Sequence, residues 1–228
     1  MESTGRAALA EFIATFGLVF IGAGAVVTAG FGLDLTGVAL AHGLALAVMV
    51  SITAHISGGM VNPAVPVGLW ISGRLSTPRA AVLVSAQLLG AVAAGFLLRY
   101  VAPGVAFEAA AGGTPLLASG IATGKGIVVE ATMTFLLVFT VFATVVDPRG
   151  PCSKTAGLWI GLVLVFATLA FGPYTGAALN PARWLGPALA SGTWSDWFVW
   201  VAGPLAGGII AAVLYSAAFL RGAEPATP

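Results

Sequence analysis

Long apolar runs, separated by short polar or glycine-rich connections, dominate the hydrophobic pattern of the chain. A helix that crosses a bilayer needs about 20 mostly apolar residues. The first run is too long for a signal-peptide core and is followed by no cleavage site, so we expect it to remain as a span. The pattern predicts six membrane-spanning helices, at residues 7–30, 37–56, 79–100, 126–146, 155–172 and 194–220.

Two connections, at residues 57–73 and 173–192, are long but still largely apolar, with turn-forming residues at their front ends. Each is too short for a complete span after its turn, so we interpret both as re-entrant half-helices. Broken backbone at membrane depth is tolerated only where it is buried in protein or lines a wet cavity. The two connections therefore mark the region where a solute path is expected.

The two halves of the chain repeat each other. Glu11 aligns with Glu130, Gly43 with Gly161, and the two Asn-Pro-Ala triplets with one another, all at an offset of about 118 residues. Three spans per half make the second half enter the membrane from the opposite face, which is an inverted repeat with its site near the midplane. We therefore expect an all-α membrane protein with an inverted 3+3 repeat. It would form one transmembrane channel domain over residues 1–228, with repeat 1 at about 7–100, a loop at 101–124 and repeat 2 at about 125–220.

Composition supports the membrane interpretation. The chain is 59% apolar and 7% charged, whereas a soluble domain carries about 25% charged residues. The net charge of +1 suggests no nucleic-acid partner. No acid–base pair, metal-ligand spacing or phosphate-binding loop occurs in the connections. We expect a lipid-embedded protein that is not an enzyme and has no metal or cofactor.

Positive charge in the connections predicts the orientation. Six cationic residues fall on the side of the termini and two on the other side; they are Arg6, Arg74, Arg79, Arg149, Lys154 and Arg221, against Lys125 and Arg99. We therefore expect an integral protein of the cell membrane, inner or plasma, with both termini cytoplasmic.

The triplets carry the strongest chemical signal, because Asn is a good helix N-cap and Pro suits the first helical position. Each carboxamide oxygen can cap a half-helix while the amide hydrogens face a lumen. Two half-helix N-termini directed at one point place about half an elementary charge each there, which disfavours cations and protons. The predicted pore motifs are Asn62, Pro63, Ala64, Asn180, Pro181 and Ala182.

Charged residues inside apolar segments are rare in this chain. Arg183 follows the second triplet, where the first repeat has Val65, and a charge at that depth marks a solute path by default. Glu11 and Glu130 are the acids inside the spans. Because they form a repeat pair, we expect each to accept hydrogen bonds from the loop before its half-helix and to hold that loop in place.

Three residues surround the first triplet. We expect His55 to pack and bond within the loop before the half-helix, and Met60 to make the cytoplasmic mouth more apolar. Pro66 lacks the backbone donor that would normally bond the carbonyl of Asn62. We therefore expect that carbonyl to be free for a pore water.

Together these residues resemble the aquaporin family of major intrinsic proteins. The matching motifs are Glu11-x-x-x-Thr15-Phe16, Ala41-His42-Gly43, the segment 55–65, Glu130 and Thr175-Gly176-x-x-x-Asn180-Pro181-Ala182-Arg183. The resemblance implies a right-handed six-helix bundle with two half-helices, assembled as a homotetramer with one pore per subunit. It also implies a four-residue selectivity filter at His42, Thr168, Ala177 and Arg183.

The implied filter departs from that of strict water channels, which resemble each other in having Phe at the first position and His at the second. This chain has His42 and the smaller Thr168 there. We expect a wider, polar filter that passes water together with ammonia, urea, hydrogen peroxide or neutral metalloid acids. The His42 pattern is similar to that of some plant vacuolar-membrane members.

Two alternatives stay open. The glycerol-conducting branch has segments similar to 172–176 and Gly186-Pro187, but Trp184 replaces the Asp usual after the filter Arg, and His42 offers the filter's one ring. A coupled transporter would need an ionisable group in its pathway. Dependence of flux on a proton or sodium gradient would distinguish a transporter from a channel.

Overall fold

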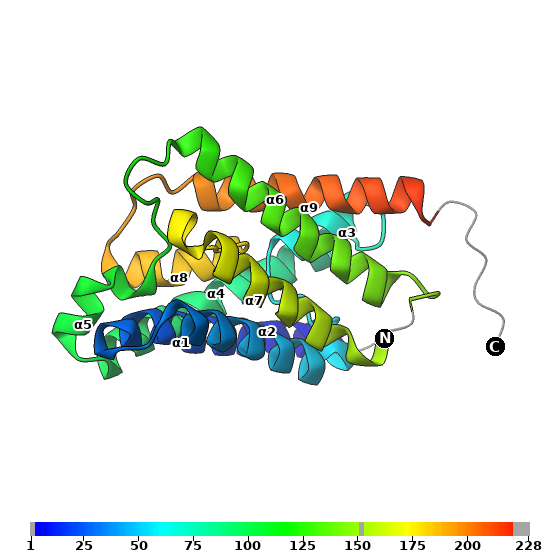
Figure 1. Ribbon diagram of the computed structural model, residues 1–228. Helices are drawn as coiled ribbons and strands as arrows, with labels where there is room; N and C mark the ends of the chain where they lie inside the picture. Colours follow the sequence, from blue (N-terminus) through cyan, green and yellow to red (C-terminus); the bar gives the residue numbers. More distant parts are fainter. Residues whose placement is uncertain (1–2, 151–152, 221–228) are drawn as a thin grey trace.

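The computed structural model describes residues 3–150 and 153–220, and all the regular elements in those ranges are helices (Figure 1). Within them, six helices are long and apolar enough to cross a membrane, when α6 is counted with the π-helical turn Phe142–Val146 that continues it. The six expected spans are therefore confirmed as α1 (Thr4–Thr28), α2 (Leu35–Ser57), α4 (Thr77–Val101), α6 (Thr123–Val141), α7 (Ala156–Thr175) and α9 (Val199–Ala218).

The two re-entrant connections contain the half-helices α3 (Ala64–Ile71) and α8 (Pro181–Ser191). Each packs against a long helix of the other repeat, α3 on α9 and α8 on α4. The first repeat pairs α1 with α2 and α4, and the second pairs α6 with α7 and α9. The half-helices therefore interlock the two repeats and place both triplets inside the bundle.

A contact between α2 and α7 also joins the repeats. A Cβ atom on Gly43 would lie 2.7 Å from the carbonyl oxygen of Gly161, and one on Gly161 would lie 2.4 Å from that of Gly43. These repeat-related glycines thus allow the two backbones to approach closely, as small residues do in membrane helix pairs.

Helix ends differ from the expected boundaries by a few residues. Helix α7 continues through Pro173 and stops at Gly176, whose φ of 76° is left-handed. Helix α9 begins at Val199, because the residues before it form turns. Shorter elements that the hydrophobic pattern did not predict are α5 (Gly104–Ala109) and the 3₁₀ turns Ala29–Phe31, Ala111–Gly113 and Ser153–Thr155.

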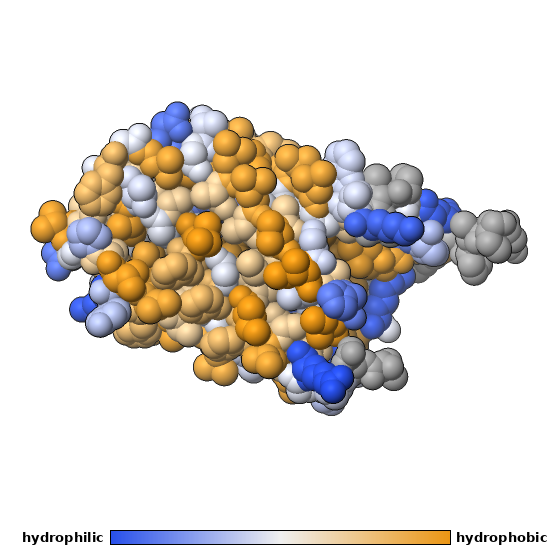
Figure 2. Space-filling view, turned by 90° about the horizontal axis from the view of Figure 1, so that it is seen from below, coloured by the Kyte–Doolittle hydropathy of each residue, from blue (hydrophilic) through white to orange (hydrophobic). Residues whose placement is uncertain are grey.

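The surface has an apolar middle and polar ends. Figure 2 shows a broad hydrophobic face, with hydrophilic residues gathered at the end where the termini lie and at the opposite tip. Leu44, Leu89 and Val128 of the long helices are more than half exposed. Hydrocarbon is the solvent that such a surface fits.

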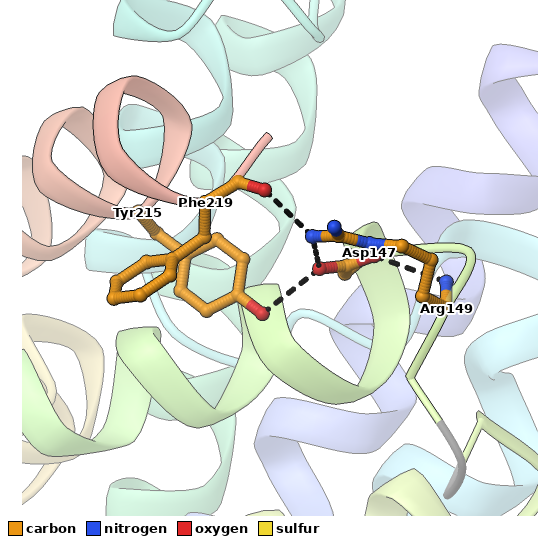
Figure 3. Close-up of polar contacts among 4 residues, drawn as sticks. All are labelled: Asp147, Arg149, Tyr215 and Phe219. Atoms are coloured by element: carbon orange, nitrogen blue, oxygen red, sulfur yellow. Dashed lines mark hydrogen bonds and ion pairs between the residues drawn. The ribbon is translucent and has the colours of Figure 1, made fainter. Parts of the chain in front are cut away.

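A polar cluster closes the end of α6 (Figure 3). Asp147 accepts hydrogen bonds from Arg149 Nε at 2.9 Å and Nη2 at 2.7 Å, and from the Tyr215 hydroxyl at 3.1 Å. Arg149 Nη2 also donates to the Phe219 carbonyl at 2.6 Å. The Arg149 guanidinium holds the pKa of Asp147 well below its usual value. The cluster therefore ties the loop after α6 to the end of α9.

Candidate functional site

The two triplets open the half-helices in slightly different ways. Asn180 is the N-cap of α8, and its Oδ1 accepts from the backbone N–H groups of Ala182 and Arg183 at 2.9 and 3.2 Å. Asn62 Oδ1 accepts from Ala64 N at 3.0 Å, and α3 begins at Ala64 with Pro63 before it. In both asparagines, the side-chain oxygen therefore accepts hydrogen bonds from the first turn of the half-helix that follows.

The amide groups of the same asparagines cross between the repeats. Asn62 Nδ2 donates to the Leu179 carbonyl and Asn180 Nδ2 donates to the Val61 carbonyl, both at 2.8 Å. A carboxamide carries two N–H donors, so each Asn keeps one donor beyond this reciprocal pair. The bonds hold the two half-helix starts together.

The expectation for the Asn62 carbonyl was wrong. It accepts a hydrogen bond from Val65 N at 3.0 Å. Pro66 has no N–H and cannot donate to this carbonyl. The first turn of α3 is tightened to an i-to-i+3 hydrogen bond, so the N–H of Val65, one residue earlier, is the donor. This carbonyl is therefore bonded to protein rather than held open for water.

Two buried carboxylates hold the loops before the half-helices. Glu11 accepts from Ser57 Oγ, from Met60 N and Val61 N, and from Gln87 Nε2, at 2.6 to 2.8 Å. All these partners are donors, so both Glu11 oxygens are occupied as acceptors.

Glu130 makes the corresponding contacts in the second repeat. It accepts from Thr175 Oγ1 at 2.7 Å, from Ala178 N at 3.0 Å and from Leu179 N at 2.8 Å. Both Glu11 and Glu130 are fully buried. Gln87 adds a donor to Glu11 where the second repeat has Pro204, so the two networks are related but not identical.

The prediction that His55 packs and bonds within the loop before the first half-helix was wrong. Its side chain is exposed on the last turn of α2 and forms no hydrogen bond with the residues that the structure describes. Gly58 ends the helix in the left-handed region, and Ser57 is the residue that bonds to the following loop. The loop is therefore braced by Ser57 and Glu11, without His55.

Arg183 is 2% exposed and contacts elements from both halves of the chain. Its Nε donates to His42 Nε2 at 3.2 Å, and its Nη1 donates to the Gly113 carbonyl at 2.8 Å. His42 Nδ1 lies 2.9 Å from the Val38 carbonyl. The neutral ring with its proton on Nδ1 satisfies both contacts, since Nε2 must then accept.

Gly113 and Gly22 are site residues that the sequence reasoning missed. Gly113 lies in the loop at 101–124 with φ 79°, and a Cβ on Gly22 would lie 2.5 Å from the His42 ring. Paired glycines at 112–113 predict a turn, but no feature of the nearby sequence indicates that the Gly113 carbonyl accepts a hydrogen bond from Arg183. The loop thus contributes a backbone acceptor that only the tertiary structure reveals.

The other two expected filter positions are buried. Thr168 on α7 is 3% exposed, and its hydroxyl has no hydrogen-bond partner in the described part of the chain. Ala177 is 1% exposed with φ 43°, in the loop before α8. The structure joins His42 to Arg183 directly, whereas Thr168 and Ala177 form no hydrogen bond with either.

A narrow cavity of about 20 Å³ lies at the triplets, lined by Asn62, Asn180, Arg183, Met60 and apolar side chains of α1, α2, α6 and α7. A cavity needs about 10–15 Å³ to hold one water. The polar groups on its wall are amide and guanidinium groups, while the remaining lining is largely apolar. This arrangement can hold a small neutral hydrogen-bonding molecule.

Comparison with known proteins identifies the family of this chain. A family profile described as "Major intrinsic protein" matches residues 2–215. "Aquaporin TIP4-4" of Zea mays is 46% identical over 96% of this chain and 90% of its own length, and "Aquaporin TIP2-1" of Arabidopsis thaliana is 43% identical over 96% and 89%. The crystal structure of the aquaglyceroporin from Plasmodium falciparum superposes with a TM-score of 0.82 at 25% identity, covering 96% of this chain and 98% of that one. This chain is therefore an integral membrane protein that belongs to the major intrinsic protein family.

Proposed function

We propose that this protein is a passive channel for water and small uncharged polar solutes, and that it excludes ions and protons. The observation that carries the proposal is the meeting of the two half-helix starts at a cavity walled by Asn62, Asn180 and Arg183. Two positive helix ends and a guanidinium at one constriction oppose cations, while a neutral solute passes at little cost. Aquaporin relatives covering nearly the whole chain support the same function.

The proposed selectivity filter is His42, Thr168, Ala177 and Arg183, with Asn62, Pro63, Ala64, Asn180, Pro181 and Ala182 at the centre. The buried Thr168 hydroxyl without a protein partner supports a polar second position. Ammonia, urea, hydrogen peroxide and neutral metalloid acids are the proposed solutes beside water. The filter has no aromatic ring besides the His42 imidazole, which argues against glycerol as the main solute.

Stopped-flow light scattering on proteoliposomes tests this function. Vesicles with the protein should shrink faster than protein-free vesicles and re-swell faster in urea than in glycerol. Leu164→Trp, which fills the cavity, should slow shrinkage, whereas Leu158→Trp, at a 47% exposed position of the same helix, should not. Shrinkage no faster than that of empty vesicles would contradict the proposal, and fast glycerol entry would favour the glycerol-facilitator alternative.

We also propose a homotetramer in the cell membrane, inner or plasma, with both termini cytoplasmic. The family resemblance supports the assembly. The orientation rests on the positive charge that the sequence assigns to the side of the termini, at Arg6, Arg74, Arg79, Arg149 and Lys154; Arg221 lies outside the described residues. Native mass spectrometry of the purified protein tests the tetramer, and a reporter fused to the C-terminus tests the orientation.

A further inference from the structure

Helix α1 lies against the edge of the His42 ring that accepts the hydrogen bond from Arg183. Gly22 is buried on α1, and a Cβ atom there would lie 2.5 Å from His42 Cδ2 and 2.6 Å from His42 Nε2. Real Cβ atoms do not approach other atoms so closely. Any side chain at position 22 would therefore displace the imidazole ring or the helix itself, which is the usual effect of overpacking a filled interior.

The next residue of α1 contacts the other acceptor of Arg183. The Gly113 carbonyl accepts from Arg183 Nη1 at 2.8 Å. A Cβ atom on Gly113 would lie 2.6 Å from the Ala23 carbonyl oxygen and 2.8 Å from Ala23 Cα, so the Gly113 backbone rests directly on α1. Gly22 and Ala23 thus lie against the two groups that orient the guanidinium, although neither residue lines the solute cavity.

His42 has little freedom to move within this arrangement. Its Nδ1 lies 2.9 Å from the Val38 carbonyl, and its Nε2 accepts from Arg183 Nε at 3.2 Å. Because both ring nitrogens are engaged, a ring that is displaced from Gly22 strains the bond to Val38 or the bond to Arg183. The position of the ring therefore depends on the absence of a side chain at Gly22.

The direction of such a displacement follows from the packing of α2. Gly22 contacts the ring from α1, whereas the proposed filter residue Thr168 lies on α7, which packs against α2 at Gly43. A methyl group on Gly22 would fill the space on the α1 side of the ring. The ring would then move away from α1, toward the Arg183 guanidinium and the opening that a solute must use, and the opening would narrow.

We propose that Gly22 is a specificity-determining residue of this channel, and that it acts by positioning the His42 ring. Without a side chain at Gly22, the ring lies back against α1 and leaves an opening for solutes bulkier than water, such as urea. The inference rests on the selectivity filter proposed above. It adds that the width of this filter is determined from α1, by a residue that does not itself contact the solute.

Stopped-flow light scattering on proteoliposomes, with water and urea as the permeants, compares Gly22→Ala with Gly24→Ala. Gly24 lies on the same helix, and a Cβ atom there would meet Leu98 Cδ1 at 3.7 Å, an ordinary van der Waals distance. Gly22→Ala should lower the ratio of urea to water permeability about tenfold, the scale on which a change of one methyl group in a pocket discriminates. Gly24→Ala should keep the wild-type ratio, and an equal ratio in the two variants would overturn the proposal.

His42→Ala separates positioning of the ring from a general effect on the fold. It removes the ring that the methyl group would displace, so adding Gly22→Ala in this background should leave the permeability ratio unchanged. A Gly22→Ala effect of the same size with and without the ring would contradict the proposal. If Gly22→Ala alone does not fold, the double variant should fold and conduct as His42→Ala does. A double variant that also fails to fold would show that the methyl group clashes with another part of the chain, and the proposal would be wrong.

A second measurement does not depend on solute flux. The chain has two histidines, so NMR of protein labelled with ¹⁵N in the imidazole rings gives two sets of signals, which His55→Gln assigns. Gly22→Ala should shift the His42 signals and Gly24→Ala should not; unshifted His42 signals in Gly22→Ala would overturn the proposal even if the protein conducts. A wild type that passes no water, with the His42 shift present in Gly22→Ala, would refute the channel function and leave the positioning of the ring supported.

Discussion

Val61 and Leu179 hold left-handed backbone conformations immediately before the two triplets, with φ of 55° and 52°. For a β-branched residue such as Val61 this region is an outlier, at a cost of about 1–3 kcal/mol. The surrounding hydrogen bonds fix it: Glu11 accepts from Val61 N, and Asn180 donates to Val61 O. The strain directs each carbonyl at the asparagine of the other repeat, so it is part of how the two halves are joined.

Replacement of Glu11 by Gln tests this support. The Gln amide group would face backbone N–H donors, and at least one buried donor would lose its acceptor. We expect a loss of stability on the order of 3 kcal/mol and slower water flux, because the first half-helix start is displaced. Thermal unfolding in detergent and stopped-flow shrinkage measure both effects. Glu108→Gln, at an exposed position, is the control, and an E11Q protein as stable as that control would contradict the prediction.

Thr168 is the residue at which solute selectivity can be tested separately from stability. Its buried hydroxyl lacks a partner in the described part of the chain, so a larger polar ring there replaces no protein hydrogen bond. We expect Thr168→His to lower urea permeability about tenfold or more, the scale on which pocket size discriminates, while water flux persists. The ratio of urea to water permeability in proteoliposomes is the readout, and a ratio that stays at the wild-type value would refute the filter assignment.

At the scale of elements, the ends of α6 and α9 are joined by the Asp147 cluster (Figure 3). The π-helical turn Phe142–Val146 precedes Asp147, and Asp147 N donates to the Phe142 carbonyl at 2.8 Å. Arg149 also caps the last carbonyls of α9 through Phe219, a favourable place for a cation. Val141, directly before the π turn, lines the solute cavity, so the cluster fixes an element that reaches the pathway.

We expect Asp147→Asn to lower the midpoint of thermal unfolding by a few degrees near neutral pH. The pKa of Asp147 is held below its usual value by Arg149, so the stabilisation is complete above the unfolded-state pKa of about 3.9. It is lost as pH falls from there toward the folded-state pKa. The stability difference between wild type and variant should therefore be constant from about pH 5 to 8 and shrink below about pH 4. A difference that grows on acidification would contradict this assignment.

At the scale of the whole molecule, the spans and the inverted repeat could be predicted because hydrocarbon imposes length and polarity on every crossing helix. The triplets could be placed because Asn and Pro have defined positions at a helix start. The continuation of α7 through Pro173 could not be read locally, since the residue before a Pro only biases a helix end.

Contacts between distant segments were the least predictable part of the site. The Gly113 carbonyl that accepts from Arg183, and the room at Gly22 for the His42 ring, depend on how a loop and two helices come together. His55 and Pro66 were misjudged for the same reason, because a neighbouring residue, Ser57 in one case and Val65 in the other, supplied the bond.

The positions of the buried acids in the bundle favour a channel over a coupled transporter. A transporter needs a group in the pathway that can bind and release a proton or an ion. Both oxygens of Glu11 and of Glu130 accept hydrogen bonds from the loops that they hold, and neither residue lines the solute cavity. We therefore expect urea uptake into proteoliposomes to follow the urea gradient alone. Imposing a pH or sodium gradient at fixed urea should leave the initial rate unchanged, and an imposed gradient that accumulates urea above its external concentration would mean that the bundle couples two fluxes.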